Sequence, residues 1–213
     1  MLKKVFDKLV LSFYQLTTLG LSKGPHITRY YMYQHLSQYA EKRPEDWKVL
    51  SISHSEALAE LLGFSEEQIT DASYPDFNVM ALPFQDGEFD CVVSDQVLEH
   101  VEGEPQLAMN ELFRVLKPNG LALHTTCFIN PAHGRPKDFW RFTPDALELL
   151  TQKNGEILDL GGWGNPLVWL FEFMGLRFQP IPDARWHPAH WLATKNHELW
   201  PIVTWVFAQK PAS

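Results

Sequence analysis

The sequence predicts an α/β fold built on a mainly parallel sheet with helices on both faces. The first observation is the valine-rich run Phe89–Ser94, which has the pattern of a strand buried on both faces. The second is Leu107–Leu116, whose apolar residues recur at helical spacing. The third is size, because 213 residues with 45% hydrophobic content supply one sizeable core. Strands that alternate with helices favour parallel pairing, which places helices over both faces of the sheet.

The first strand and helix of this pattern are expected directly after residue 46. Val49–Ser53 is a short apolar strand candidate. Ser55–Leu62 has apolar residues at helical spacing and is expected to end at Gly63, because glycine accepts the backbone conformation that follows a helix. Ile69–Ala72 is predicted to be a second, short strand.

The second half of the chain continues the alternation. Pro105 suits a first helical turn, and Lys117–Gly120 (KPNG) should end that helix because proline cannot continue it. Leu121–Phe128 is expected to be a buried strand. Thr143 should cap the next helix. Two late strands are expected after it, at Glu156–Leu160 and Ile202–Ala208.

Residues 1–45 are predicted to form a helical extension, and residues 46–213 the main domain. Gly24 and Pro25 break the helical pattern of the extension near its middle. Val5, Leu9, Phe13 and Leu16 fall at helical spacing and predict an amphipathic helix. One interpretation is that this helix packs on the domain. The other is that it docks on a membrane surface or on a partner.

Charge and composition exclude several classes of protein. The net charge is −8, so the surface should repel the phosphate backbone and broad nucleic-acid binding is not expected. No segment has the roughly 18 uncharged apolar residues of a membrane span. Cys91 and Cys127 lie inside apolar runs and are expected to be buried and reduced, which favours a cytoplasmic location.

Four short segments follow one another along the middle of the chain: Leu82–Phe84 (LPF), Phe89–Asp90 (FD), Leu98–Val101 (LEHV) and Arg114–Pro118 (RVLKP). Together they resemble the central signature of class I S-adenosylmethionine-dependent methyltransferases, of the methyltransferase type 11 kind. Their order and joint spacing are highly specific, and the resemblance covers about residues 47–150. It implies a Rossmann-like sheet, S-adenosyl-L-methionine as the cofactor and methyl transfer as the reaction.

The resemblance implies a cofactor site at the ends of the first strands. Polar groups after Phe89–Ser94 would face the crevice beyond the carboxyl ends of the strands, although Asp95 could instead only cap the next helix. Leu82–Phe84 would offer an apolar wall to adenine, or else ordinary core. The residues expected to bind the cofactor are Ser51, Ser53, His54, Asp71, Asn78, Val79, Asp95 and Gln96.

Two features depart from the family pattern. The first loop, Ser51–Glu56, contains no glycine, and His54 should disfavour the positive φ that glycine would allow there. Too few residues separate Asp71 from Leu82 for a full helix and strand, so one βα unit should be shortened. Asp71 is the preferred ligand of the ribose, with Asp76 as the rival. Each of these acids, like Asn78, could equally be a solvated loop residue.

The acceptor side is expected after Leu121–Phe128. The segment 131–144, PAHGRPKDFWRFTP, resembles one found in a subfamily of uncharacterised methyltransferase-like proteins. His133 is the candidate general base, and His100, Asp138 and Trp140 are candidate substrate-binding residues. The alternatives are a solvated His133, a His100 that caps or packs on its helix, and an Asp138 paired with Arg135 or Arg141.

Other aromatic and histidine residues suggest further roles. Trp140, Phe142, Trp163 and Trp169 would line an acceptor pocket or simply pack in the core. His187, His190 and His197 do not have the spacing of a common zinc site, so no metal is expected.

Two functions follow from these patterns. The first is a methyltransferase that uses S-adenosyl-L-methionine and acts on a small-molecule, lipid-linked or sugar-linked acceptor. The second is a non-catalytic binding or interaction module that keeps the fold, suggested by the glycine-free loop and the shortened unit. Contact of the N-terminal helix with a membrane is compatible with both. The sequence does not fix the oligomeric state.

Overall fold

The computed structural model describes residues 2–134 and 137–212, and its chain divides into two compact units. The helical unit comprises residues 1–35 and 163–202, and the sheet unit comprises residues 36–162 and 203–213. Compactness of the backbone defines these two units. The predicted boundary between residues 45 and 46 is a different division of the chain, and it stays a prediction.

The helical unit contains short elements from both ends of the sequence. The strands β1 (Lys23–His26) and β7 (Pro180–Pro182) pair antiparallel. The helices are α1 (Leu2–Thr17), α2 (Ile27–Leu36, which ends one residue into the sheet unit), α6 (Val168–Phe173) and α7 (Pro188–Thr194). The expected break at Gly24 and Pro25 is therefore strand β1. None of the described helices combines the length and hydropathy needed to cross a bilayer.

Helix α1 does not pack through the stripe that the sequence singled out. Val5, Leu9, Phe13 and Leu16 are between 53% and 69% exposed. The stripe is therefore not the surface through which this helix packs, and the packing of the helix on the main domain stays a prediction. Tyr14, on another face of the helix, is the side chain that is buried.

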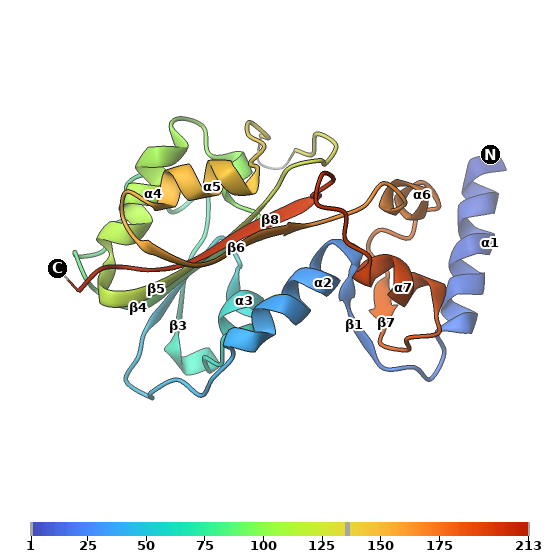
Figure 1. The fold of residues 1–213 in the computed structure, drawn as a ribbon, viewed down its shortest axis with the longest axis horizontal. Coiled ribbons are helices and arrows are strands. Elements are labelled where there is room, and N and C mark those ends of the chain that lie inside the picture. The colour runs from blue at the N-terminus through green and yellow to red at the C-terminus, as the bar shows by residue number, and fades with distance from the viewer. Residues whose placement is uncertain (1, 135–136, 213) are drawn as a thin grey trace. The chain divides into compact units, whose positions relative to one another are not determined.

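The sheet unit holds a six-stranded sheet in the order β3-β2-β4-β5-β8-β6 (Figure 1). The pairs β3–β2, β2–β4 and β4–β5 are parallel, and β5–β8 is antiparallel, so the expected mainly parallel sheet is confirmed. The strands are β2 (Val49–Ile52), β3 (Ile69–Ala72), β4 (Phe89–Asp95), β5 (Leu116–Cys127), β6 (Glu156–Trp163) and β8 (Val203–Gln209).

One βα unit is replaced by a loop, as the spacing predicted. Residues 73–88 connect β3 to β4 and form no helix or sheet strand, only an isolated bridge between Asn78 and Ala81. Strand β3 is consequently the edge of the sheet. The loop that replaces the missing unit lies beside the functional site described below.

Helices cover both faces of the sheet, with α4 (Pro105–Arg114) and α5 (Pro144–Thr151) on one face and α3 (Glu56–Leu61) on the other (Figure 1). Thr143 caps α5 by accepting a hydrogen bond from the backbone N–H of Ala146 at 3.1 Å, as predicted. Three short 3₁₀ turns complete the unit, at Ser37–Tyr39, Glu66–Gln68 and Leu98–His100.

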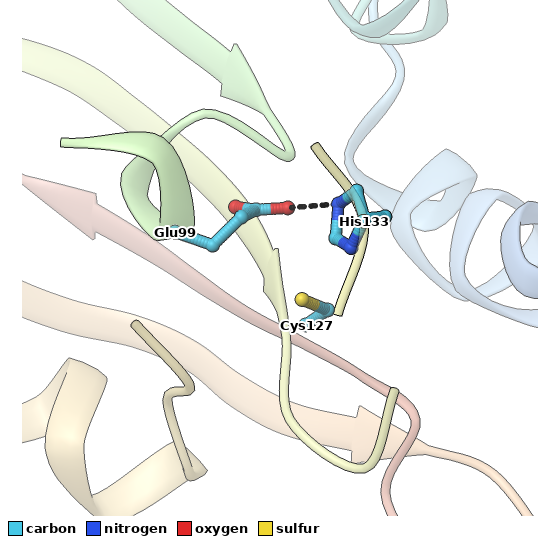
Figure 2. A group of neighbouring side chains, drawn as sticks. All are labelled: Glu99, Cys127 and His133. Atoms are coloured by element: carbon cyan, nitrogen blue, oxygen red, sulfur yellow. Dashed lines mark ion pairs between the residues drawn. The ribbon is translucent and has the colours of Figure 1, made fainter. Parts of the chain in front are cut away.

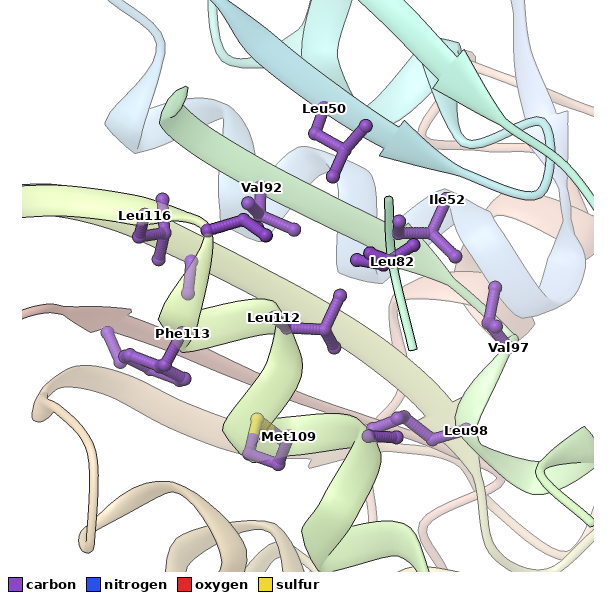
Figure 3. Packing of buried hydrophobic residues seen from close by; sticks show 14 of the residues in the cluster. Leu50, Ile52, Leu82, Val92, Val97, Leu98, Met109, Leu112, Phe113 and Leu116 are labelled. Atoms are coloured by element: carbon purple, nitrogen blue, oxygen red, sulfur yellow. The ribbon is translucent and has the colours of Figure 1, made fainter. Parts of the chain in front are cut away.

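The core lies between the sheet and α4 (Figure 3). Met109, Leu112 and Phe113 of α4 pack with Leu50 of β2 and Val92 of β4, and all five are almost completely buried. The two cysteines are also buried as free thiols, as expected. Burial of such side chains is the main favourable term in folding.

Strand β5 begins earlier than the sequence suggested. It starts at Leu116 and not at Leu121, because Leu116 already pairs with Phe89. The register then shifts, so that Cys91 pairs with Leu121. Lys117–Gly120 therefore form an irregularity within the ladder, where Asn119 takes the left-handed conformation with φ of 62°.

Arg114, at the end of α4, holds the loop that precedes β4. Its guanidinium donates to the carbonyl oxygens of Leu82 (3.1 Å) and Phe84 (2.9 Å), to both carboxylate oxygens of Glu111 and to Asp86. The planar guanidinium can serve all these acceptors because it carries five donors in a fixed fork. The RVLKP and LPF segments of the signature are thus joined by one side chain.

We expect Arg114→Ala to lower the free energy of unfolding by about 2 kcal/mol, because carbonyls and a carboxylate of the 82–86 loop lose their donors. Arg114→Lys should recover only part of this loss, since an ammonium cannot reach all the acceptors. Urea denaturation of the three proteins measures the effect. An Arg114→Ala variant as stable as the parent would contradict the clamping role.

Candidate cofactor and acceptor site

A cavity of about 870 Å³ lies at the carboxyl ends of β2 and β4, within the sheet unit. Its size falls in the range of small-molecule sites. Its wall is formed by the first loop, by the 73–88 loop and by the segments after β4 and β5. The lining residues are Ile52, Ser53, His54, Tyr74, Pro75, Phe77, Asn78, Val79, Met80, Gln96, Val97, His100, Val101, Glu102, Lys137 and Phe139.

The first loop takes the backbone conformation of a glycine loop although it has no glycine. Ser53 and His54 have φ of 53° and 64°, in the left-handed region. The expectation that His54 would avoid positive φ is therefore wrong. A non-glycine residue in this region costs roughly 1–2 kcal/mol, so the surrounding structure must hold the loop in place.

Asp71, at the end of β3, holds the first loop. Its Oδ1 accepts hydrogen bonds from Ser51 Oγ (2.8 Å) and from the backbone N–H of His54 (3.0 Å). Its Oδ2 accepts from Ser73 Oγ. Neither Asp71 nor Ser51 lines the cavity, and the rival acid Asp76 is exposed and also lies outside its lining. The binding of ribose by Asp71 stays a prediction, while its contact with the loop is a structural fact.

Asp95 and Gln96, at the end of β4, are tied to β5. Thr125 Oγ1 donates to Asp95 Oδ1, and the backbone N–H of Gln96 donates to the carbonyl of Thr125 at 2.9 Å. Gln96 lines the cavity with φ of 60°. Asp95 does not cap the next helical turn, because Val97 occupies its N-cap position. The cap interpretation of Asp95 is therefore wrong.

His133 lies between two carboxylates on the acceptor side. Its Nδ1 is 3.3 Å from Asp138 Oδ2, and its Nε2 is 3.8 Å from Glu99 Oε1. The backbone N–H of His133 also donates to Asp138 at 2.7 Å. Arg141 pairs with Asp138, and hydrogen bonds from Arg141 hold the pKa of that carboxyl well below its usual range. Of the two predicted partners of Asp138, Arg141 is the one observed, and Arg135 lies outside the described residues.

Glu99 is the residue of this cluster that sequence reasoning missed. It belongs to the LEHV segment and is completely buried, with Oε2 accepting from Thr126 Oγ1 at 2.8 Å. Oε1 accepts no hydrogen bond from any residue that the structure describes, and it points toward His133 (Figure 2). Burial raises the pKa of Glu99. The pattern gave no signal for it, because a Glu before His in a short helical turn looks like an exposed position.

Cys127, at the end of β5, faces the same cluster (Figure 2). One ligand atom from each of Glu99, Cys127 and His133 lies within 4.8 Å of the others. Burial raises the pKa of the Cys127 thiol to about 12, so the thiol is protonated at neutral pH. A protonated thiol and a carboxyl with a raised pKa favour proton handling by this cluster, because a metal requires deprotonated ligands.

Of the four residues predicted on the acceptor side, only His100 lines the cavity. The ring of His100 meets the ring of His133 edge-on at 5.0 Å. His133, Asp138 and Trp140 lie outside the cavity lining. Trp140 Nε1 donates to the carbonyl of Val101, a residue that does line it. The roles of these four side chains in catalysis stay predictions.

Several other residues with a suggested role at the site pack within the protein instead. Leu82 is core and Phe84 packs on Phe77 and Phe89, so the apolar wall of the cavity comes from Phe77, Val79 and Met80 and not from Leu82–Phe84. Phe142 and Trp163 are buried, and neither they nor Trp169 line the cavity. His187 caps α7 by accepting from the backbone N–H of Ala189, and His190 contacts Tyr30.

Residues 33–124 match the family model of the methyltransferase domain (Methyltransf_11). An uncharacterized protein of Haemophilus influenzae is 43% identical over 58 residues, which are 26% of this chain and 23% of that protein. The matched segment thus spans less than a quarter of this curated relative.

Solved structures share the fold at low identity. An S-adenosylmethionine-dependent methyltransferase from Mesorhizobium loti matches with a TM-score of 0.52 and 12% identity, over 86% of this chain and 100% of that one. The [4+2]-cyclase SpnF matches with a TM-score of 0.55 and 16% identity, over 100% and 96%. The fold is therefore that of class I methyltransferases, a fold that also occurs in a cyclase.

We expect His54→Gly to raise the free energy of unfolding by about 1 kcal/mol, because glycine adopts the left-handed conformation without the steric cost. The side chain of His54 is 78% exposed, so little packing is lost. Thermal denaturation beside His54→Ala, which keeps the strain, provides the comparison. A glycine variant less stable than the alanine variant would exclude relief of strain.

We expect the stability of the parent relative to Glu99→Gln to fall as pH rises. The pKa of Glu99 is raised in the folded chain, so its stabilising contribution is complete below the unfolded value of about 4.5 and is lost as pH increases toward the folded value. Glutamine mimics the protonated acid and does not titrate. The difference in unfolding free energy should change by about 1 kcal/mol or more between acidic and alkaline pH. A constant difference would show that Glu99 does not gain a proton on folding.

Proposed function

We propose that this chain, which has the class I methyltransferase fold, binds S-adenosyl-L-methionine in the 870 Å³ cavity and transfers its methyl group to an acceptor beside His100 and His133. The observation that carries the proposal is the convergence at this cavity of the left-handed first loop, Gln96 and His100. In open parallel sheets, ligands bind beyond the carboxyl ends of the strands, which is where this cavity lies.

The residues present fit such a cofactor. Phe77, Val79 and Met80 form an apolar wall against which a purine face can pack, and Asn78 supplies an amide beside it. Backbone of Ser53 and His54 turns at the cavity edge in the conformation that allows close approach to a ligand. The eight residues expected to bind the cofactor fall into two groups. Five line the cavity (Ser53, His54, Asn78, Val79 and Gln96), and three support its loops (Ser51, Asp71 and Asp95).

The bound cofactor supplies an electrophilic methyl group on a sulfonium. A hydroxyl or amine acceptor loses a proton when its lone pair takes that methyl group, so a base beside the cavity is useful. His133 is our assignment for this base. If its Nδ1–H points to Asp138, the lone pair remains on Nε2, and the imidazolium formed would face the Glu99 carboxyl.

His100 has the complementary role of contacting the acceptor at the cavity wall. Its Nδ1 is 2.9 Å from the carbonyl oxygen of Lys137, an arrangement in which Nδ1 donates and Nε2 accepts. Alignment of acceptor and methyl group provides much of the acceleration in such a displacement. The acceptor is expected to be a small molecule or a lipid- or sugar-linked precursor.

The second candidate is a methyltransferase fold without catalysis. The observation in its favour is the loop of residues 73–88, which replaces a βα unit and leaves β3 as the sheet edge. Such a chain would use the cavity to bind a different ligand or would use the sheet unit for protein contact. The two candidates predict opposite results when the cofactor product is titrated into the protein.

We expect S-adenosylhomocysteine to bind the full chain with a dissociation constant in the micromolar range. Val79→Arg should weaken binding by about tenfold or more, because a long charged side chain replaces part of the apolar wall. Leu149→Arg, at an exposed position of α5 outside the cavity lining, is the matched control and should leave affinity unchanged. Isothermal titration calorimetry measures all three. No binding by the parent, at an unchanged melting temperature, would favour the non-catalytic module.

A further inference from the structure

Helix α1 presents its apolar side chains outward. Leu9, Phe13 and Leu16 are 66%, 68% and 69% exposed. Tyr14 lies on the opposite side, is buried, and donates from its hydroxyl to the carbonyl of Pro180 at 2.9 Å. An amphipathic helix in a globular protein normally turns its apolar stripe to the core. Here the side that carries Tyr14 is packed and the apolar stripe is open.

The exposed apolar surface extends beyond α1 within the helical unit. Of the twenty large hydrophobic side chains that are exposed among the described residues, fourteen belong to this unit, which has 75 of the 213 residues. Phe173 of α6 adjoins α1, since the Lys3 ammonium lies 5.3 Å from the centre of its ring. Phe178, Trp186 and Trp191 are also more than half exposed. Apolar exposure on this scale marks an interaction surface.

The helical unit is basic although the whole chain is acidic. It carries eight Lys and Arg residues and four Asp and Glu residues, a net charge of +4. The sheet unit carries ten and 22, a net charge of −12. Lys3, Lys4 and Lys8 are exposed on α1 itself. Lysines can bury their alkyl stems beside an apolar stripe while the ammonium groups stay in the aqueous layer.

We propose that the helical unit binds the surface of an anionic lipid bilayer, with the apolar stripe of α1 inserted at the headgroup boundary. Outward Leu and Phe side chains flanked by lysines, together with exposed Trp side chains, are the features of an interfacial amphipathic helix. Anionic headgroups complement the charge of +4 and attract basic residues near the surface. A second copy of the chain would instead bring two surfaces of the same positive charge together.

Sedimentation of the full chain with vesicles tests this proposal. We expect vesicles that contain phosphatidylglycerol to bind the protein at least about tenfold more tightly than vesicles of phosphatidylcholine alone, with the difference shrinking as salt is added. The double substitution Leu9→Glu and Phe13→Glu should abolish binding. Lys4→Glu with Lys8→Glu should remove the preference for anionic vesicles.

The matched control is Leu149→Glu with Leu158→Glu, two exposed leucines of the sheet unit, which should bind vesicles like the parent. All variants should keep the melting temperature of the parent, because the replaced side chains are already exposed. Failure of the parent to bind anionic vesicles would overturn the proposal. So would vesicle binding that survives Leu9→Glu with Phe13→Glu. A parent dimer that this double variant converts to a monomer, without vesicle binding, would assign the surface to a second copy.

Discussion

Parallel pairing of β2, β4 and β5 is the constraint on which the site depends. The register places Ile52 beside Ser94, and Ser94 beside His124, so the three strands end at one edge of the sheet. The loops that follow must therefore meet, whatever their sequences. The cavity and the left-handed turns at Ser53, His54 and Gln96 lie at or beyond this edge. So does the cluster of Glu99, Cys127 and His133.

In this chain, side-chain hydrogen bonds stabilise a left-handed loop conformation that usually depends on glycine. Glycine gives a ligand-binding loop its left-handed turn without steric cost. In this chain the turn at Ser53 and His54 is held by Asp71, which accepts from Ser51 and from the His54 backbone. Ser55 adds a second tie, because its Oγ accepts from the backbone N–H of Asp95 at 2.8 Å. The loop therefore reaches the left-handed conformation without glycine, and side-chain hydrogen bonds hold it there.

The two compact units divide the chemistry of the chain. The acidic sheet unit contains the cavity and the Glu99–His133 cluster, whereas the basic helical unit contains most of the exposed apolar surface. A net charge of −8 for the whole chain hides this division. If both proposals hold, catalysis and membrane contact belong to different units, and each can be altered without the other.

Most strands and helices of the sheet unit could be predicted from the sequence alone. Short apolar runs predicted β2 and β3, the valine-rich run Phe89–Ser94 predicted β4, and Pro105 and Thr143 marked the starts of α4 and α5. The interval between Asp71 and Leu82 revealed the missing unit. The tertiary structure alone decided that Glu99 is buried against His133, that Asp71 holds the first loop, and that the stripe of α1 faces outward. The physical reason is that periodicity specifies which residues share a face. What that face meets depends on segments far away in the chain.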